Sequence, residues 1–235
     1  MPEPVQVRSM FARIAGRYDL LNRVLSAGID RRWRRAAVDC VGTVEGRLVV
    51  DACCGTGDLS MEFVRAGAGV VGVDFTPEML ARAKPKRGAR GGACLFVHGD
   101  ALRLPLVNGA ADACSVAFGL RNVADRHAAM GEMLRVVRPG GRLVVLEFST
   151  PPGLLFGGLY RLYFTRILPL VGRCVSRHDD AYRYLPRTVL EWPRPDLLED
   201  ELERSGWEEC GHRLLTGGIA CLHWGRAPRG GAGER

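Results

Sequence analysis

The spacing of apolar residues divides the chain into two parts. From Val5 to Val41 they recur at steps of three and four residues, as in helices that bury one face. From Arg47 onward, short unbroken apolar runs alternate with amphipathic stretches, and such runs are typical of strands buried on both faces. These runs predict strands at 48–51, 70–74, 94–98, 112–118 and 143–148.

Helices are predicted between these strands, at 59–66, 77–83 and 126–137. Alternating strands and helices indicate a parallel sheet with helices on both faces, joined by right-handed crossovers. An amphipathic helix at 197–205 and an antiparallel pair of strands within 207–224 follow. The pattern therefore predicts an α/β fold whose sheet is mostly parallel.

The same pattern suggests how the chain is organised. We expect an N-terminal helical segment at 1–44 that acts as a substrate or lid segment, and a main domain at 45–225. Within that domain, 154–195 is predicted to be an insertion that lines a ligand pocket. Residues 226–235 are rich in glycine and charge, and are predicted to be a disordered tail.

A cluster of arginines lies in the N-terminal part. We predict a helix that begins near Asp30 as its N-cap and carries the arginines around Trp33. The cluster comprises Arg31, Arg32, Arg34 and Arg35. It could contact phosphates or anionic lipid, but the interpretation favoured here is a solvated helix face.

Composition narrows the function classes only slightly. A net charge of +7 is compatible with an anionic partner and equally with a solvated surface. Eight cysteines are present without a C-x-x-C pair or a Cys/His cluster of zinc spacing, so no metal site is predicted. Without a secretory signal pattern or an apolar run of about 20 residues, we expect a cytoplasmic protein with reduced thiols.

A glycine-rich loop joins the first predicted strand to the helix that follows it. The loop reads D-A-C-C-G-T-G-D from Asp51 to Asp58. Gly55 and Gly57 would let the backbone approach a ligand closely at the carboxyl edge of the sheet. Such a loop is weak evidence by itself, because a tight turn needs the same residues.

Acidic residues at the strand ends make the prediction more specific. Asp74 ends the next strand, about 20 residues beyond the loop, where a carboxylate can accept hydrogen bonds from both ribose hydroxyls. Asp51 and Asp74 together favour S-adenosylmethionine, whose ammonium and sulfonium groups are cationic. Asp100 follows the third strand and can accept from the adenine amino group, or alternatively cap the next turn.

Motifs in a fixed order along the chain carry a family resemblance. F-G-L-R-N-V at 118–123 resembles the signature of the UbiE/MenG-type C-methyltransferases of ubiquinone and menaquinone biosynthesis. Further matching motifs are F-A-x-I-A-x-x-Y-D-x-L-N at 11–22, G-I-D-x-x-W at 28–33, R-P-G-G at 138–141, L-E-F at 146–148, D-x-Y-R-Y-L at 180–185 and L-T-G-G-I-A at 215–220. The resemblance runs from about residue 7 to 225.

The resemblance implies a class I S-adenosylmethionine-dependent methyltransferase fold, which is Rossmann-like with a mostly parallel seven-stranded sheet. It also implies methylation of a ring carbon of demethylmenaquinol, or of a polyprenyl methoxybenzoquinol. Residues at the family's cofactor-binding positions are Thr56, Asp74, Asp100, Ala101 and Ala117.

The resemblance also assigns residues around the acceptor. Arg121, Asn122 and Tyr18 match positions that the family is thought to use near the quinol hydroxyl. Because an arginine is effectively always protonated, we expect Arg121 to stabilise the developing oxyanion, while Tyr18 or water relays the proton. The alternative for Arg121 is a structural ion pair at the strand end.

The stretch 154–170 mixes Leu, Phe and Tyr with arginines, and is predicted to contact the prenyl tail at a membrane surface, or else to pack as a core helix. The expected partners are a prenylated quinol and the inner face of the plasma membrane, with a homodimer or a quinone-biosynthesis complex left open. No nucleic acid is expected, because F-G-L-R-N replaces the base-stacking [DNS]-P-P-[YFW] motif. The alternatives are a paralogue with another hydrophobic acceptor and a non-catalytic S-adenosylmethionine-binding protein.

Overall fold

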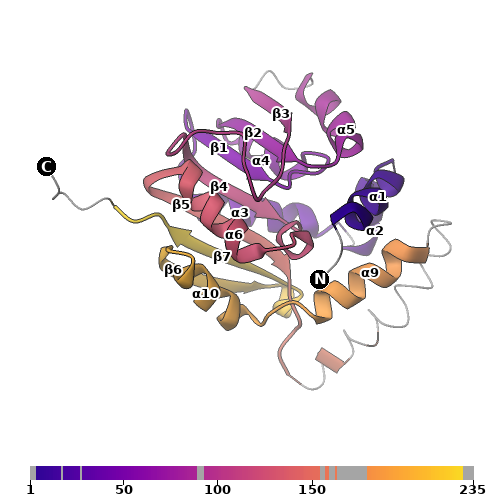
Figure 1. Cartoon of the computed structure of the whole chain (residues 1–235). Coiled ribbons are helices and arrows are strands. Elements are labelled where there is room, and N and C mark those ends of the chain that lie inside the picture. The colour runs from indigo at the N-terminus through magenta and orange to yellow at the C-terminus, as the bar shows by residue number, and fades with distance from the viewer. Residues whose placement is uncertain are drawn as a thin grey trace, which may run out of the picture.

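Seven strands form a single sheet in the order β3-β2-β1-β4-β5-β7-β6 (Figure 1). The computed structural model describes residues 4–16, 18–26, 28–88, 93–153, 157–158, 162 and 179–229. The strands are β1 (Leu48–Ala52), β2 (Gly69–Asp74), β3 (Cys94–His98), β4 (Ala111–Ala117), β5 (Val137–Phe148), β6 (Glu208–Leu215) and β7 (Ala220–Arg226). Strands β1 to β5 pair in parallel, whereas β7 is antiparallel to β5 and β6. The predicted mostly parallel seven-stranded sheet is confirmed.

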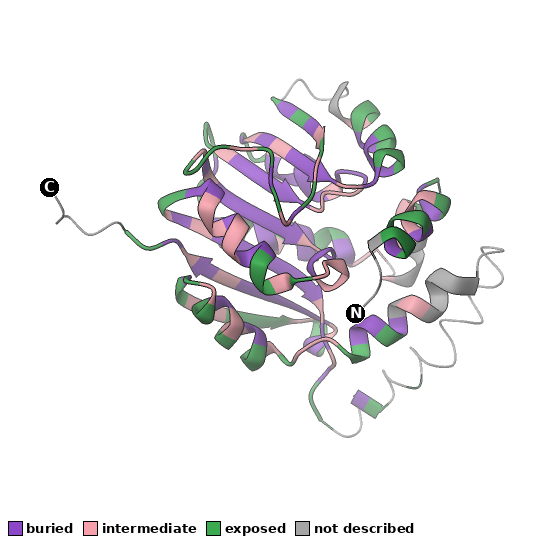
Figure 2. Cartoon of the chain, in the orientation of Figure 1, coloured by how far each residue is buried: buried purple, intermediate pink, exposed green. Residues whose placement is uncertain are grey.

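Helices cover both faces of this sheet, as the alternating pattern predicted. They are α1 (Pro4–Ile14), α2 (Tyr18–Leu25), α3 (Asp30–Val41), α4 (Asp58–Arg65), α5 (Pro77–Gly88), α6 (Arg126–Val136), α9 (Asp179–Leu190) and α10 (Pro195–Arg204), with 3-10 turns η1 (Leu120–Asn122) and η3 (Thr216–Gly218). One core cluster joins α3, α4 and α5 to one face, and a second joins α6 and α10 to the other. The central strands are accordingly buried along most of their length (Figure 2).

Strand β5 begins earlier than the predicted start at residue 143. Val137 already pairs with Ala111 of β4, and the register then shifts so that Arg142 pairs with Ala113. The glycines between them fit this irregularity, because a Cβ on Gly141 would lie 2.6 Å from the Asp112 carbonyl oxygen. R-P-G-G therefore interrupts the ladder locally and does not end it.

Helix α3 starts where the sequence predicted it, but Asp30 is not its N-cap. The helix begins at Asp30, and the preceding Ile29 provides no side-chain cap. Asp30 accepts a hydrogen bond from Ser26 Oγ at 2.8 Å and forms an ion pair with Arg34. The predicted N-cap role of Asp30 is therefore wrong, because its carboxylate is engaged by side chains.

The last strand of the sheet ends beyond the predicted boundary at residue 225. Strand β7 includes Arg226, and Ala227 after it is buried and hydrogen-bonded to Gly140 and Gly141 through its backbone, so ordered structure extends past residue 225. Most of the 154–170 stretch and residues 230–235 of the predicted tail lie outside the described residues. Among the described residues, no helix combines the length and apolar character that a membrane crossing requires.

Candidate functional site

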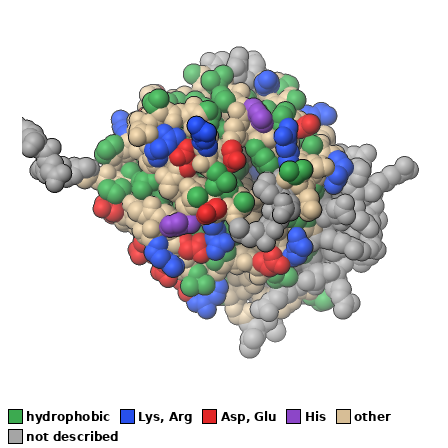
Figure 3. Space-filling model, in the orientation of Figure 1, with side chains coloured by type: hydrophobic (Ala, Val, Ile, Leu, Met, Phe, Trp, Pro, Cys, Tyr) green, Lys and Arg blue, Asp and Glu red, His purple; other side chains and the backbone are tan. Residues whose placement is uncertain are grey.

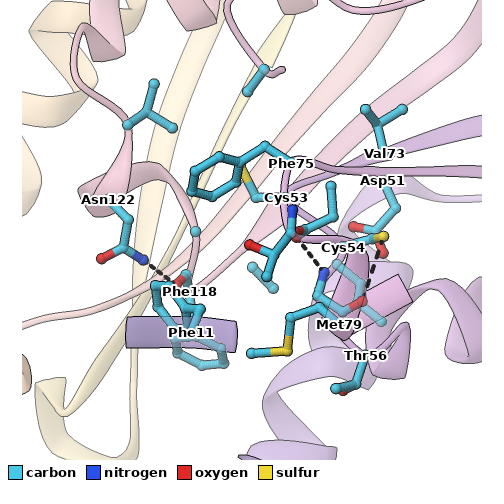
Figure 4. A pocket seen from close by; sticks show the side chains of 18 of the residues that line it. Phe11, Asp51, Cys53, Cys54, Thr56, Val73, Phe75, Met79, Phe118 and Asn122 are labelled. Atoms are coloured by element: carbon cyan, nitrogen blue, oxygen red, sulfur yellow. Dashed lines mark hydrogen bonds between the residues drawn. The ribbon is translucent and has the colours of Figure 1, made fainter. Parts of the chain in front are cut away.

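A cavity that is partly open to solvent lies at the carboxyl ends of β1, β2 and β4. The parallel strands explain its place, because their carboxyl ends meet at one edge of the sheet, where ligands bind in open α/β folds. Phe11, Tyr18 and Arg34 from the N-terminal helices close another side. In Figure 4, Asn122 and Phe118 lie on one side of the cavity, and Asp51 and Val73 lie on the other.

The two glycines of the loop have different roles. Gly55 has a φ of +55° and borders the cavity, and a Cβ on it would have no atom within 4 Å. Gly57 has a φ of +79° but is not among the lining residues, and a Cβ on it would lie 2.7 Å from Phe96 Cζ. Gly55 therefore keeps the cavity wall open, whereas Gly57 allows α4 to pack on β3.

Asp74 is held rigidly at the end of β2. Its Oδ2 accepts from the Gly55 N–H and its Oδ1 from the Thr76 N–H, both at 2.8 Å. Burial raises the pKa of Asp74, although these backbone donors act in the opposite direction. The Thr76 side chain also bonds to this carboxylate, whose two oxygens have about four acceptor sites, so the group keeps acceptor capacity for a ligand in the cavity. A vicinal diol such as ribose fits this arrangement.

Asp51 is almost fully buried at the end of β1. Its carboxylate accepts from Ser60 Oγ at 2.5 Å and from Ser115 Oγ at 3.2 Å. Burial raises the pKa of Asp51 to about 6, which the two serine hydroxyls only partly offset. A cationic ligand group near this carboxylate would favour its charged form.

The structure brings the remaining predicted cofactor residues to the same cavity. Asp100, Ala101 and Ala117 all line it. Asp100 Oδ1 also accepts from the Leu102 N–H at 2.9 Å, which is the turn cap considered as its alternative role. Of the eight residues predicted to bind the cofactor, Gly57 is the one that does not line the cavity.

Thr56 connects the loop to the N-terminal helices. Its hydroxyl donates to Asp19 Oδ1 of α2 at 2.5 Å. Asp19 in turn pairs with Lys86 of α5 at 2.6 Å, and Lys86 pairs with Asp58 at the same distance. The N-terminal segment is thus tied to the glycine loop by polar contacts.

Two of the three predicted catalytic residues line the cavity. Tyr18 and Asn122 both contribute to its wall. The Asn122 side chain donates to the Phe118 carbonyl oxygen at 3.3 Å and accepts from the Tyr184 hydroxyl at 3.0 Å (Figure 4 shows the first bond). Burial raises the pKa of Tyr18, so its phenol remains a proton donor at neutral pH.

Arg121, the third residue, does not line the cavity. Its Nη1 donates to Glu147 Oε2 at 2.8 Å and to the Phe118 carbonyl oxygen at 2.6 Å. The side chains of Arg121 and Glu147 are 6% and 0% exposed, and burial raises the Glu147 pKa against the effect of Arg121. This geometry corresponds to the structural ion pair considered as the alternative, and a direct catalytic role for Arg121 stays a prediction.

Sequence reasoning missed Arg34. Arg31, Arg32 and Arg35 are exposed as predicted, but the expectation is wrong for Arg34, whose side chain is 7% exposed and lines the cavity. The signal was its helical spacing, because Arg34 lies three, four and seven residues before the buried Ala37, Val38 and Val41. A charged residue on the buried face of an amphipathic helix needs a partner or a site.

Within the described residues, no group of three or more His, Cys, Asp or Glu side chains could hold a metal ion. Cys53 and Cys54 border the cavity, and burial raises the pKa of both thiols well above the ordinary value. His178 lies outside the described residues.

Comparison with known proteins places this geometry in a family context. The sequence matches the ubiE/COQ5 methyltransferase family over residues 3–227. It is 49% identical to a demethylmenaquinone methyltransferase of Thermus thermophilus, with 93% of this chain and all of that protein covered. It is 44% identical to a ubiquinone/menaquinone biosynthesis C-methyltransferase of Geobacter sp. strain M21, with 94% of this chain and 95% of that protein covered.

Solved structures resemble the chain at the level of the fold. A methyltransferase from Thermotoga maritima described as a possible histamine N-methyltransferase superposes with a TM-score of 0.67 at 17% identity, covering 93% of this chain and 99% of that one. A SAM-dependent methyltransferase from Aquifex aeolicus gives 0.59 at 15% identity, covering 97% and 100%. The fold is that of the class I methyltransferases, as expected.

Proposed function

Because the chain belongs to the ubiE/COQ5 methyltransferase family, we propose that it methylates a ring carbon of a prenylated quinol, with demethylmenaquinol as the main acceptor. The observation that carries this proposal is the 49% identity to a demethylmenaquinone methyltransferase over that protein's full length. The chain is an S-adenosylmethionine-dependent methyltransferase, and a polyprenyl methoxybenzoquinol is the second acceptor we consider.

The cavity suits this cofactor chemically. S-adenosylmethionine supplies a methyl group on a sulfonium, which is already a strong electrophile. Asp74, with both oxygens fixed by backbone N–H groups, would accept from the ribose hydroxyls. Asp100 and Ala101 would border the adenine, and Asp51 would face the cationic part of the molecule.

The protein must also make the acceptor carbon nucleophilic. A quinol carbon gains electron density when the neighbouring hydroxyl loses its proton, so a donor that stabilises the oxyanion lowers the barrier. Tyr18 and Asn122 line the cavity and have the required polar groups. We assign the oxyanion contact to these two residues, with water carrying the proton away.

Arg121 would then act mainly through its neighbours. It precedes Asn122 in the turn η1, and its guanidinium holds the Phe118 carbonyl oxygen that also accepts from Asn122. Its charge is paired with Glu147. We therefore propose Arg121 as a positioning residue for Asn122.

The prenyl tail of the acceptor must be shielded from water or remain in lipid. Val5, Leu20 and Leu162 are 77%, 54% and 52% exposed. On the face drawn in Figure 3, basic and acidic side chains of the described residues are interspersed, so the net charge forms no single basic stripe there. We propose that apolar contacts of the N-terminal helices, with the 154–170 stretch, hold the protein peripherally at the membrane.

A paired experiment tests the proposed function. Lipid extracts of a strain lacking this protein should accumulate the demethylated quinone that is its acceptor. The purified protein should transfer a labelled methyl group from S-adenosylmethionine to the reduced form of that quinone. A protein that binds the cofactor but methylates neither quinol class would overturn the acceptor assignment.

A further inference from the structure

The charges on the cavity wall are unequal in number and suggest how one end of the cofactor is recognised. The lining residues that the structure describes include four carboxylates, Asp51, Asp58, Asp74 and Asp100, but Arg34 is their one cation. S-adenosylmethionine carries two cationic groups and one carboxylate. A single buried guanidinium therefore matches the single negative charge of the ligand.

Arg34 is fixed in place from behind. It forms an ion pair with Asp30 one helical turn earlier, and Asp30 is itself held by the Ser26 hydroxyl at 2.8 Å. Its Cζ lies 5.8 Å from the centroid of the Phe118 ring, so an aromatic face also supports it. A guanidinium has five N–H donors, and these contacts leave some of them for a ligand.

Asp58 lies beside Arg34 on the cavity wall. It opens α4 directly after the glycine loop, and its Oδ1 accepts from Lys86 Nζ at 2.6 Å. Its Oδ2 is 3.8 Å from Arg34 Nη2, which is beyond direct hydrogen-bond distance. A cation and an anion side by side, both lining the cavity and not tightly closed on each other, are complementary to an α-amino acid zwitterion.

We propose that Arg34 binds the α-carboxylate and Asp58 the α-ammonium group of S-adenosylmethionine. This inference rests on the proposed use of that cofactor and adds the residues that recognise its methionine end. Asp74, Asp100 and Ala101 are assigned to the adenosine end, and they lie at or after the ends of β2 and β3, whereas Arg34 and Asp58 belong to α3 and α4. The same contacts would hold the product S-adenosylhomocysteine, which retains both groups.

A comparison of two ligands tests this subsite without relying on turnover. S-adenosylhomocysteine contains the amino acid end, whereas 5′-methylthioadenosine lacks it and keeps the adenosine and the thioether. Isothermal calorimetry would measure both dissociation constants for the wild type, Arg34→Gln and Asp58→Asn. Arg35→Gln is the matched control, because Arg35 is the next residue of α3 and its side chain is 65% exposed.

Arg34→Gln and Asp58→Asn should each raise the dissociation constant of S-adenosylhomocysteine about 10- to 100-fold, since each variant loses a charge-assisted contact. Both variants should leave the dissociation constant of 5′-methylthioadenosine within about threefold of the wild-type value. Arg35→Gln should change the dissociation constant of neither ligand. If Arg34→Gln fails to fold, Arg34→Lys can replace it, because lysine keeps the positive charge opposite Asp30. Arg34→Lys should lose affinity for S-adenosylhomocysteine but not for 5′-methylthioadenosine.

Two results would overturn the assignment. If Arg34→Gln binds both ligands more weakly by the same factor, Arg34 shapes the cavity and does not bind the amino acid end. If Arg34→Gln binds both ligands normally but loses most of its methyl-transfer activity, Arg34 stabilises the acceptor oxyanion instead. A wild-type protein that binds 5′-methylthioadenosine and S-adenosylhomocysteine equally well would also remove the subsite, whereas one that binds no adenosine ligand would refute the proposed function itself.

Discussion

The Tyr184 hydroxyl donates a hydrogen bond to Asn122 Oδ1 at 3.0 Å and so joins α9 to the turn that borders the cavity. The two residues are 62 positions apart in the sequence. Asn122 is thereby held from two sides, because its amide also donates to the Phe118 carbonyl oxygen. The amide is fixed in one orientation, as a group that contacts the acceptor must be.

Tyr184→Phe tests this relationship with the removal of one oxygen atom. Losing the bond should cost about 1 kcal/mol of unfolding free energy and leave cofactor affinity unchanged. Turnover should fall about tenfold, because the amide is then free to rotate. Leu190→Ala, at the exposed end of α9, is the control. Normal turnover in Tyr184→Phe would show that Asn122 needs no such support.

Arg121 and Glu147 provide a second test, in which stability and catalysis can be separated. Arg121→Ala should destabilise the fold by about 3–5 kcal/mol, because the fully buried Glu147 loses its partner. The double variant Arg121→Met/Glu147→Leu should regain most of that free energy, since an apolar pair of similar size carries no buried charge. Thermal melting with and without cofactor measures both effects.

Activity of the same double variant decides the role of Arg121. The ion pair is neutral as a whole, so we expect turnover to recover to within about tenfold of the wild type. A stable double variant whose turnover stays about 100- to 1000-fold low would show that Arg121 stabilises the oxyanion directly.

Asp51 predicts a pH dependence of stability and binding. Burial raises its pKa from 3.8 to about 6, so between these values the folded chain keeps a proton that the unfolded chain has lost. The free energy of unfolding should therefore fall as pH rises through this window. A cationic ligand favours the carboxylate, so S-adenosylmethionine should bind more tightly as pH rises through about 6, with release of a proton.

Calorimetry in buffers of different ionisation enthalpy measures that proton. Asp51→Asn should abolish its release and flatten the pH dependence, while the amide still accepts from one of the serine hydroxyls. Unchanged proton release in Asp51→Asn would assign the titration to another group.

Asp74→Ala should weaken S-adenosylmethionine severely, because the ribose would lose two charge-assisted bonds worth about 1.5–3 kcal/mol each. The melting temperature should also fall, since the Gly55 and Thr76 N–H groups lose their acceptor. Asp74→Asn keeps one acceptor oxygen, so its affinity for S-adenosylmethionine should lie between those of the wild type and Asp74→Ala. Unchanged affinity in folded Asp74→Ala would contradict the ribose assignment.

Much of the fold could be predicted because the information was local. Unbroken apolar runs predicted each end of β1 to β4 within one residue of its observed position. Helix α9 was missed because it contains Pro186, and a proline inside a pattern normally argues against a helix. The N-cap role given to Asp30 was wrong for a different reason, since the preference of this residue for an N-cap was overridden by its contacts with Ser26 and Arg34.

The site was predictable to the extent that strand ends determine it. Asp51 and Asp74 end neighbouring parallel strands, so the topology alone brings them to one edge. The pairing of Arg121 with Glu147 depends on the packing of η1 against β5, across 26 positions of sequence. No local pattern could distinguish that buried ion pair from an arginine facing the acceptor.

The N-terminal helices carry exposed apolar side chains that we expect to meet the membrane surface, where the acceptor's prenyl tail would reside. Val5 and Leu20 are exposed on α1 and α2, which are among the helices that close the cavity, and their side chains could enter the interfacial region of a bilayer. Val5→Ser/Leu20→Ser should therefore weaken binding to vesicles of anionic phospholipid, by about 1 kcal/mol for each side chain.

The control is chosen by position. Val107 is 75% exposed, nearly the same as Val5 at 77%, but it precedes β4 and so lies toward the opposite edge of the sheet from the cavity. Val107→Ser should leave vesicle flotation unchanged. The wild type, Val5→Ser/Leu20→Ser and Val107→Ser should methylate a short-tailed quinol equally, because the chemistry does not depend on the bilayer. A long-tailed quinol in vesicles should be methylated more slowly by Val5→Ser/Leu20→Ser alone. Equal flotation and equal long-tail activity in the three proteins would show that the N-terminal helices do not contact the membrane. The 154–170 stretch would then be the remaining candidate for membrane contact, with Leu155, Phe156 and Tyr160 as the residues to replace next.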